Sequence, residues 1–538
     1  MHFHLYKRHW SWASILSPLR DPRFSAVASF YVFTSRRWAR KIFLPPSPPP
    51  EPILGHLRLV PPEFQWKTFS KWGKTVGDFI YISLLGKPVV ILNSVEAVHD
   101  LLDKKAGIYS DRPRFILHAE LFKLTTFMPF MRNGQNFRDQ RRLMQLQLCS
   151  QAILDYRPTQ LVQVHRFLKN VLYSPERFID HVHRLSASTL VLATYGHEIK
   201  SDDDQIYRLA REMAKKTEIG VPGATIPDLI PILKYLPSWI PGASFQKVAM
   251  EVSTLARKFI DIPFGEVENR RNSGTAIPSL VTRMLDDYEA KQIKDEIHEM
   301  NMKNAAAVLY IAGVESSEDV LMSFLLMMTR HPEFVERAQN EIDSVLGSER
   351  LPNLDDRPNL PFVECVLKEV YRFNPPLPLA IPHSNYKEDT YRGCTIPQGS
   401  MVIPNIWQMM RDERYFIKPE KFDPERFYSS ICQSISNSQS FIGVSRTAPD
   451  NPSSLIFGFG RRICPGRYFA DANAWLVIAN LLAVFRIRPP VDPTTGESII
   501  PELKFSCGIT SKPKPFNYVI TPRSEKHVSL IVNSSPVP

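Results

Sequence analysis

The sequence has few cysteines for its length. Six occur in 538 residues, and none forms a C-x-x-C pair. So small and scattered a set excludes a disulfide framework and favours a reducing compartment. Five of the six are interpreted as small buried hydrophobic residues. The remaining one, Cys464, lies in a glycine-rich stretch that points to a different role.

The sequence also lacks an apolar run long enough to cross a membrane. A spanning helix needs about 20 apolar residues, but the best candidate extends only from Phe24 to Thr34. A basic cluster at 36–41 and the proline-rich stretch Leu44–Pro52 follow it. This order is typical of a cytosolic domain held at a membrane. We therefore expect residues 1–43 to form an atypical membrane-proximal segment. A disordered tail and a shortened first exon are the alternatives.

No long block of basic residues and no nucleic-acid-binding motif is present. The net charge is nevertheless +11, from 66 Lys and Arg against 55 Asp and Glu. Such a balance suits nucleic acid, an anionic membrane or an acidic protein partner. Without a motif, nucleic acid is the least favoured of the three and is not expected as a partner. A basic solvated surface with no special partner fits equally well.

No internal repeat follows residue 53, and local patterns predict four segments. Asp78–Leu92 is expected to form a β-hairpin around a Gly-Lys-Pro turn. A long helix is predicted from Gln292 to Arg330, where His-Pro ends it. The proline-punctuated stretch 219–246 suits a mobile lid, a membrane-dipping loop or a buried irregular connection. Tyr428–Ser453 is polar and predicts an exposed loop.

Residues 457–466 read FGFGRRICPG and have the features that a haem-bound thiolate requires. Such a sulfur is kept deprotonated by backbone amides and positive charge around it. Gly460 and Gly466 let the chain turn tightly around Cys464. Phe457 can shield the sulfur, and Arg462 can pair with a haem propionate. A tight turn with an incidental cysteine is the alternative.

This stretch resembles the F-x-x-G-x-R-x-C-x-G loop of the cytochromes P450 and matches it at every specified position. The resemblance implies that Cys464 is the axial ligand of haem b iron. It also implies a mainly α fold with a minor β region, a single large helical prism-shaped domain. We assign that catalytic domain to residues 44–523 and a C-terminal tail to residues 524–538.

Further motifs follow in the order of the family. Glu369 and Arg372 resemble its E-x-x-R pair, which on a helix places acid and base on one face. Arg426 lies in a P-E-R-F stretch like the one that completes the family's network. The resemblance implies a structural role for these three residues. Alone, the pair would read as a surface salt bridge.

Residues 312–317, AGVESS, lie within the predicted long helix. Gly313 costs about 1 kcal/mol in a helix interior, which suggests close approach of a ligand. Glu315 beside Ser316 offers the acid and hydroxyl that proton delivery needs. The stretch resembles the family's A-G-x-[DE]-T-[TS] motif with Ser316 in the threonine position, so we expect proton delivery with more peroxide leakage. Polar residues facing solvent are the alternative.

Three more residues are candidate contacts of the haem propionates. Phe137 and Arg141 resemble the family's W-x-x-x-R, with phenylalanine replacing the tryptophan. His383 lies where the family often places another propionate contact, although an isolated histidine is more often an ordinary polar residue. With Phe457, Gly460, Arg462 and Gly466, they complete the predicted cofactor-binding set.

The implied activity is haem-dependent insertion of one oxygen atom from dioxygen into a hydrophobic small molecule, a secondary metabolite or a xenobiotic. Within the family the chain resembles fungal microsomal enzymes, those akin to O-methylsterigmatocystin oxidoreductase and mushroom tryptamine 4-monooxygenase. NADPH electrons would come from a separate NADPH–cytochrome P450 reductase, because the chain has no nucleotide-binding fingerprint; cytochrome b5 is a second candidate partner. The enzyme would sit at the endoplasmic reticulum membrane and face the cytosol.

Two other activities and one sequence feature stay open at this point. A haem-thiolate isomerase or dehydratase would need neither dioxygen nor a reductase, and a non-catalytic haem-binding protein would need no oxygen chemistry. The pair Glu315 and Ser316 argues against both. Ile431–Ile442 is longer than the family pattern requires, and is either a surface insertion or retained non-coding sequence.

Overall fold

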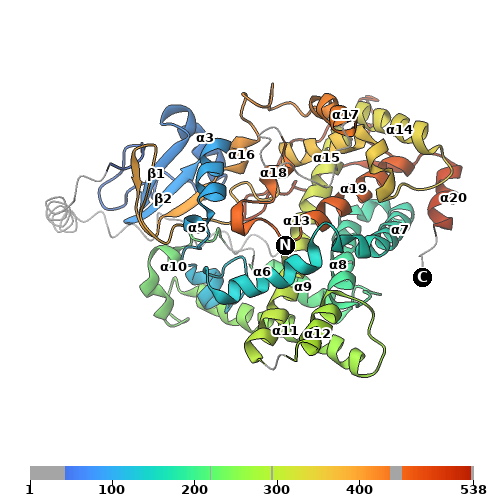
Figure 1. Ribbon diagram of the computed structural model, residues 1–538. Helices are drawn as coiled ribbons and strands as arrows, with labels where there is room; N and C mark the ends of the chain where they lie inside the picture. Colours follow the sequence, from blue (N-terminus) through green and yellow to red (C-terminus); the bar gives the residue numbers. More distant parts are fainter. Residues whose placement is uncertain (1–42, 218–219, 293–294, 437–450, 535–538) are drawn as a thin grey trace.

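A computed structural model of the chain describes residues 43–217, 220–292, 295–436 and 451–534. A β-rich part lies at one side and a larger helical part at the other (Figure 1). The predicted membrane-proximal segment falls almost wholly outside the described residues. Within them, no helix has both the length and the apolar character needed to cross a bilayer.

The β-rich part is built on one four-stranded sheet and carries a short hairpin. The sheet order is β1-β2-β6-β3, with strands β1 (Phe79–Leu84), β2 (Lys87–Leu92), β6 (Met401–Pro404) and β3 (His383–Ser384). Strands β2 and β6 are parallel, and the other two pairs are antiparallel. Two further antiparallel pairs of strands lie in the described chain: the hairpin of β4 (Asp389–Tyr391) with β5 (Cys394–Ile396), and β7 (Phe485–Arg488) with β8 (Val519–Pro522).

The predicted hairpin is confirmed, but its turn lies one residue earlier than expected. Leu84 pairs with Lys87, so the turn residues are Leu85 and Gly86. Both have positive φ angles, 51° and 81°, as a two-residue type I′ turn requires. Lys87 and Pro88 therefore belong to strand β2, and the Gly-Lys-Pro turn was wrong in position.

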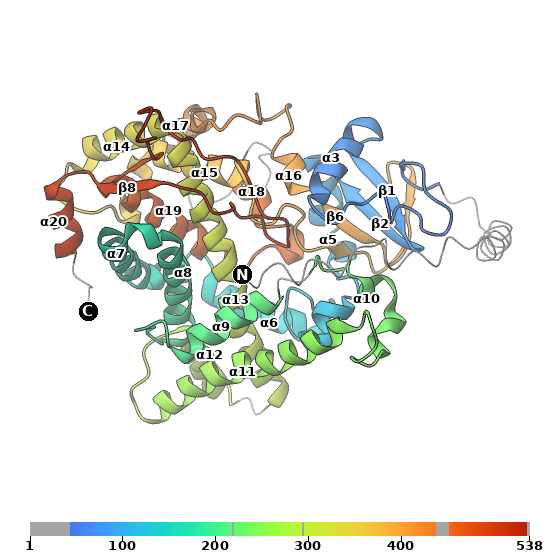
Figure 2. The ribbon, with the colours of Figure 1, turned by 180° about the vertical axis from the view of Figure 1, so that it is seen from behind.

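The helical part is organised around α13 (Glu296–Arg330), which runs through the middle of the molecule (Figure 2). Its neighbours are α6 (Gln135–Leu148), α8 (Phe178–Tyr195), α11 (Ser244–Asn272), α15 (Pro361–Phe373) and α19 (Arg467–Val484). The long-helix prediction is confirmed: Asp295 caps the first turn through the Ile297 amide, and the helix ends at His331 before Pro332.

The remaining helical segments surround these elements. The longer ones are α3 (Gln65–Thr75), α7 (Arg157–Tyr173), α9 (Gln205–Thr217), α12 (Leu280–Ala290), α14 (Pro332–Leu346), α17 (Tyr428–Ser436) and α20 (Glu525–Asn533). The short ones are α4 (Val95–Val98), η3 (His99–Lys104), α5 (Ala106–Tyr109), η4 (Ile116–Leu121), η5 (Ala152–Tyr156), η6 (Pro175–Arg177), α10 (Ile226–Leu229), η7 (Pro231–Tyr235), η8 (Leu354–Asn359), α16 (Ile406–Met409), η9 (Pro424–Phe427), α18 (Ser453–Ile456) and η10 (Gly460–Arg462).

Two sequence expectations need correction here. Tyr428–Ser453 was expected to be an exposed loop, yet its first nine residues form α17, in which Ile431 is only 1% exposed. Ile431 joins the apolar core around α15 and α19, and this burial outweighs the polar composition. The rest of the proposed surplus, residues 437–442, lies outside the described residues. Cys149 is exposed, not a buried hydrophobic residue.

The stretch 220–246 is buried in one part and exposed in another, and its role as a lid or as a membrane-dipping loop stays a prediction. Its first part is anchored: the buried Asp228 carboxylate accepts hydrogen bonds from the amides of Ile116 (2.5 Å) and Gly223 (3.0 Å). Its second part is open, because Tyr235 is 71% and Trp239 80% exposed. A fixed wall thus continues into an exposed apolar tip.

Candidate active site

The site is centred on Cys464, which η10 and α19 hold between them. Its amide donates to the carbonyl of Phe457 (2.7 Å), and its carbonyl accepts from Nη1 of Arg467 (3.1 Å). Burial raises the pKa of the thiol, while the Gly466 amide, Arg141 and Arg467 lower it. Burial is the largest effect, so a stable thiolate needs a stronger positive partner. A coordinated metal ion is such a partner, because it deprotonates a thiol outright.

Gly460 allows the cysteine loop to pack against η3, and this matters more than the turn of the chain around the sulfur. Its φ is +54°, and a Cβ added to it would lie 2.1 Å from the carbonyl oxygen of Leu102. Its amide donates to Oδ1 of Asp103 (2.6 Å). Only glycine therefore lets η10 pack against η3. At Gly466 a Cβ would lie 3.9 Å from the Cys464 sulfur, which is an ordinary contact.

Four cationic or basic side chains gather beside the loop, and three of them were predicted. Arg462 donates to the carbonyls of Ser110, Met128 and Met131 at 2.7, 3.0 and 2.8 Å. The predicted Arg141 is buried and donates to the Ile463 carbonyl. His383 is also buried, and its Nδ1 lies 2.9 Å from the Tyr109 carbonyl oxygen.

The fourth member, Arg112, was missed by the sequence analysis. Its Nη1 donates to the carbonyls of Ile381 (2.7 Å) and Pro382 (2.8 Å), and its Nε to that of Pro129 (2.9 Å). The side chain is only 5% exposed. No local signal marks it, because its partners lie 17 to 270 residues away.

Arg112 and Arg462 donate to neutral carbonyl groups, so these hydrogen bonds bring no negative charge to the cluster. Burial lowers the pKa of Arg462 to about 9, with Asp111 opposing and Arg141 reinforcing the shift. Burial, and then Arg462, lower the pKa of Arg112 well below its usual range. The nearby Asp111 is itself bound by Arg132 (2.8 Å). A buried positive cluster of this kind calls for an anionic ligand, and the two propionates of haem fit it.

Phe137 reaches the cluster indirectly. The Arg462 guanidinium lies over its ring, 3.7 Å from the centroid. The ring is buried on α6, the helix that also presents Arg141. Phe137 thus orients Arg462 through a cation–π contact, which needs no indole N–H. Shielding of the sulfur by Phe457 stays a prediction; its ring packs edge-on against Tyr371, with centroids 6.1 Å apart.

The opposite wall is the middle of α13. A Cβ at Gly466 would lie 3.7 Å from Cδ1 of Leu309, so α13 reaches the cysteine loop there. Ser316 follows seven residues later, about 10 Å along the helix. Ala312 is exposed, and Gly313, Glu315 and Ser316 beside it are half-buried. The Ser316 hydroxyl donates to the Ala312 carbonyl (2.9 Å).

Helix packing also restricts the position of Gly313. A Cβ added there would lie 2.7 Å from Cδ1 of Leu190 on α8, so a larger residue would displace that side chain. Close approach of a ligand to Gly313 stays a prediction. The acid and hydroxyl beside it, Glu315 and Ser316, keep the positions that the motif predicts for proton delivery.

The structure brings Glu369, Arg372 and Arg426 together in one buried network. Glu369 accepts from Nε (2.7 Å) and Nη2 (2.8 Å) of Arg372 and from Nε of Arg426 (3.1 Å). Arg372 also donates to the carbonyls of Met410 and Pro419, both at 2.9 Å. Glu369 and Arg372 are fully buried. The network ties α15 to the irregular chain at 410–426, on the side of the cysteine loop.

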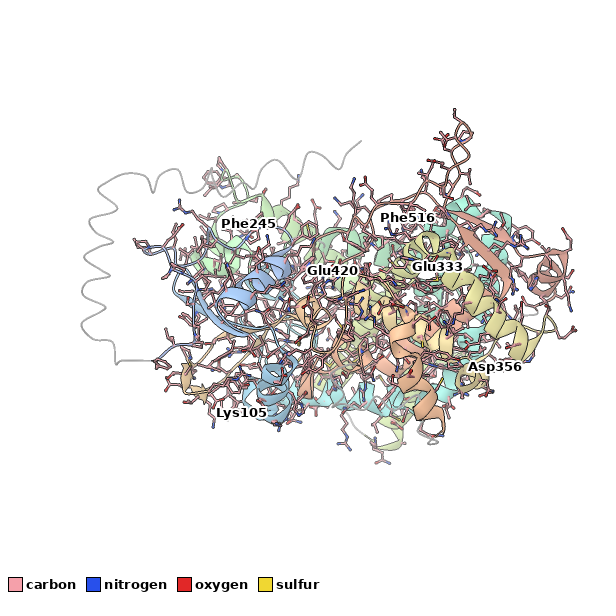
Figure 3. All side chains as sticks on the ribbon, turned by 90° about the horizontal axis from the view of Figure 1, so that it is seen from above. Lys105, Phe245, Glu333, Asp356, Glu420 and Phe516 are labelled. Carbon is pink, nitrogen blue, oxygen red and sulfur yellow. The ribbon has the colours of Figure 1, made fainter. Side chains whose placement is uncertain are left out.

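Figure 3 shows where this irregular chain lies. Glu420, which approaches Arg411 at 3.5 Å, lies between Lys105 of the β-rich side and Glu333 of the helical side. The network therefore joins the two parts of the molecule.

Fold and site together are those of a haem-thiolate protein: a largely helical chain with a cysteine in a glycine-rich loop, a cluster of basic side chains beside it and an acid–hydroxyl pair on the facing helix. The cytochrome P450 family model matches residues 45–520. Cytochrome P450 monooxygenase 176 of Postia placenta is 39% identical over 95% of this chain and 96% of its own length. For claR of Ampulloclitocybe clavipes the identity is 37% over 91% and 89%, and for COX1 of Coprinopsis cinerea 33% over 94% and 97%.

The chain belongs to the cytochrome P450 family. The mainly α fold, the fungal relatives and the haem monooxygenase activity predicted from the sequence are confirmed by these similarities. They favour the monooxygenase over the isomerase and over a non-catalytic haem-binding protein.

Proposed function

We propose that this monooxygenase oxidises a hydrophobic small molecule, a secondary metabolite or a xenobiotic, with NADPH electrons supplied by a separate flavoprotein reductase. The observation that supports the substrate class is an apolar crevice, too small for the substrate itself, between the β-rich part and the wall at 220–223. Its lining includes Phe64, Trp66, Pro222, Leu379 and Ile381. Such a lining selects ligands by apolar contact and offers few polar groups.

Haem, when bound, supplies the activation of dioxygen at its iron. Cys464 would hold the iron from one side and donate electron density to it. Arg112, Arg141, Arg462 and His383 would hold the propionates, and this would compensate their buried charge. The substrate would meet the helix face that carries Ala312, where apolar neighbours exclude water.

Glu315 and Ser316 would bring protons to this face. The Ser316 hydroxyl donates to the Ala312 carbonyl, so it would turn away from that carbonyl to pass on its proton while it receives one from the Glu315 side. Serine has no γ-methyl group to fix its rotamer. We therefore expect more hydrogen peroxide per NADPH than a threonine would allow.

The exposed face of α6 suits an acidic reductase. Arg138 and Arg142 are exposed on this helix, while Phe137 and Arg141 on its other face point into the site. Arg461 is exposed in the cysteine loop itself, and Arg467 lies half-buried after it. Reversing the charge of Arg142 should raise the reductase concentration needed for half-maximal rate and leave turnover driven by added hydroperoxide unchanged.

Attachment to the endoplasmic reticulum membrane would use the exposed tip of the 219–246 stretch. Ile232 is 68% exposed, and Tyr235 and Trp239 are exposed further. Apolar and aromatic residues of this kind settle at a membrane interface. Binding to phosphatidylcholine vesicles should weaken when Ile232 and Trp239 are both replaced by serine.

The reduced, carbon-monoxide-bound absorption spectrum tests the assignment first. A Soret band at the thiolate position is expected for the wild type and should be lost in Cys464→Ala. A substrate screen with co-expressed reductase then tests the activity. Hydroxylated products that depend on NADPH support it, whereas rearranged products formed without NADPH would favour the isomerase. Peroxide yield unchanged in Ser316→Ala would refute the proton role of that residue.

A further inference from the structure

A second acid lies on α13, one turn beyond the acid–hydroxyl pair. Asp319 is 1% exposed. It follows Glu315 by four residues and Ser316 by three, so the three side chains share one helix face. Among the described residues, its Oδ2 atom has no hydrogen-bond partner. An ionised carboxylate in such a place is costly, and a buried carboxyl group with an unused oxygen therefore calls for an explanation.

Asp319 faces the turn at 508–512. The first residues of this turn also line the apolar crevice beside residues 220–223. The Thr510 side chain hydrogen-bonds the Asp319 carboxyl group, and the Lys512 ammonium acts on it through its charge. The turn is itself held in place, because Nδ2 of Asn374 donates to the Ser511 carbonyl (2.7 Å). The geometry around Asp319 is thus fixed on both sides.

The charged groups around Asp319 divide into two sets. On its own helix are Glu315 and Glu318, and Glu318 pairs with His183 of α8 (3.0 Å). From the facing turn comes Lys512, which is half-buried and so connects the interior with solvent. Burial raises the pKa of Asp319 well above its usual range, against the opposing effect of Lys512. Burial thus favours the form of the carboxyl group that carries a proton.

We propose that Asp319 is a relay residue that supplies protons to Glu315 and Ser316 during oxygen activation. Reduction of the second oxygen atom to water consumes two protons, so the pair must be reprotonated. Asp319 gives its carboxyl proton to the Glu315–Ser316 pair and takes one from the Lys512 ammonium, which regains a proton from solvent. No electron moves and no other bond changes. The inference rests on the monooxygenase activity.

A purely structural role would also bury Asp319, and the experiment has to separate the two. Asp319→Asn keeps the shape and removes the transferable proton, whereas Asp319→Glu retains the acid. Thr510→Val keeps the shape of its side chain and removes the hydrogen bond from the facing turn. All three are prepared with haem, and the carbon-monoxide-bound spectrum verifies the thiolate site in each.

Infrared difference spectroscopy in water and in heavy water reads the carboxyl group directly. A band of a protonated carboxylic acid is expected in the wild type and should be lost in Asp319→Asn. The second readout uses reductase, NADPH and dioxygen. In Asp319→Asn the ratio of water to hydrogen peroxide should fall by about tenfold, less than the 10²–10⁴ that a direct general acid contributes. The solvent isotope effect should rise, and Asp319→Glu should restore both values.

The outcomes are distinct. If the wild type has no such band, or if Asp319→Asn leaves the product ratio and the isotope effect unchanged, the relay is refuted. If Asp319→Asn does not fold, Thr510→Val decides: a higher isotope effect supports the relay, and an unchanged one overturns it. If the wild type oxidises no NADPH, the monooxygenase activity is contradicted. In that case the infrared band alone still shows whether Asp319 is protonated.

Discussion

The substitution Glu369→Gln tests how much the buried network contributes to stability. In the wild type the carboxylate accepts three hydrogen bonds from Arg372 and Arg426 at 2.7–3.1 Å and one from the Asp423 amide (2.7 Å). Glutamine keeps the size of the side chain and removes its charge. Its amide NH₂ also places a donor against donors, so part of the network loses its acceptor.

The expected loss follows from burial. Glu369 and Arg372 are 0% exposed, so the substitution leaves a guanidinium buried without its counter-charge. Breaking such a pair costs about 3–5 kcal/mol. The loss should appear in the free energy of unfolding of the haem-loaded protein, measured by circular dichroism in urea. Because the network also holds the chain at 410–426, haem should dissociate earlier in the titration.

Glu349→Gln is the matched control. Glu349 pairs with Lys526 at 2.7 Å, the same distance as the shortest bond of the network, but its side chain is 79% exposed. Solvent screens such a pair, and no measurable change is expected. Equal losses in the two variants, or a loss below about 1 kcal/mol for Glu369→Gln, would refute the role of burial.

Three further predictions concern the haem site and the glycines. Arg112→Met should weaken haem retention by about 1.5–3 kcal/mol, the value of a hydrogen bond to a charged group; unchanged haem transfer to apomyoglobin would contradict it. Gly460→Ala should lower stability by more than the 1–2 kcal/mol of a left-handed residue. Gly496→Ala is the control, because Gly496 has a φ of +71° and an added Cβ would meet no atom within 4 Å. It should show the cost of the left-handed backbone alone. Equal thermal shifts in the two variants would exclude a clash between the new Cβ at position 460 and the Leu102 carbonyl. Gly313→Ala should lower the free energy of unfolding, and adding Leu190→Ala should recover part of that loss. If the losses of the two single variants simply add in the double variant, contact between residues 313 and 190 is excluded.

Motifs that depend on local spacing could be predicted well from the sequence. The hairpin at 79–92 and the helix ending at Arg330 follow from periodicity and from proline. Cys464 and its loop could be predicted for a similar reason, because glycines and arginines at fixed spacing have few other uses. The α17 helix was missed because its residues have only a weak local preference for the helix. The helix is stabilised instead by burial of Ile431 against helices that are distant in the sequence.

The site as a whole depended on contacts that no local pattern records. Arg112 joins the cluster through carbonyls at 129, 381 and 382. Gly313 lies against a leucine of another helix, and the raised pKa of Asp319 depends on its burial near a turn about 190 residues away. Energies of this kind arise from desolvation, which is a property of the packed interior.

The sequence by itself therefore determined the family and predicted the thiol ligand and the acid–hydroxyl pair, since these depend on residue types at fixed short spacing. Only the tertiary structure decided which buried charges face one another, and hence which groups can hold the propionates and which acid keeps its proton. The physical reason is that burial and charge interactions depend on distance in space, which the order of residues along the chain does not specify.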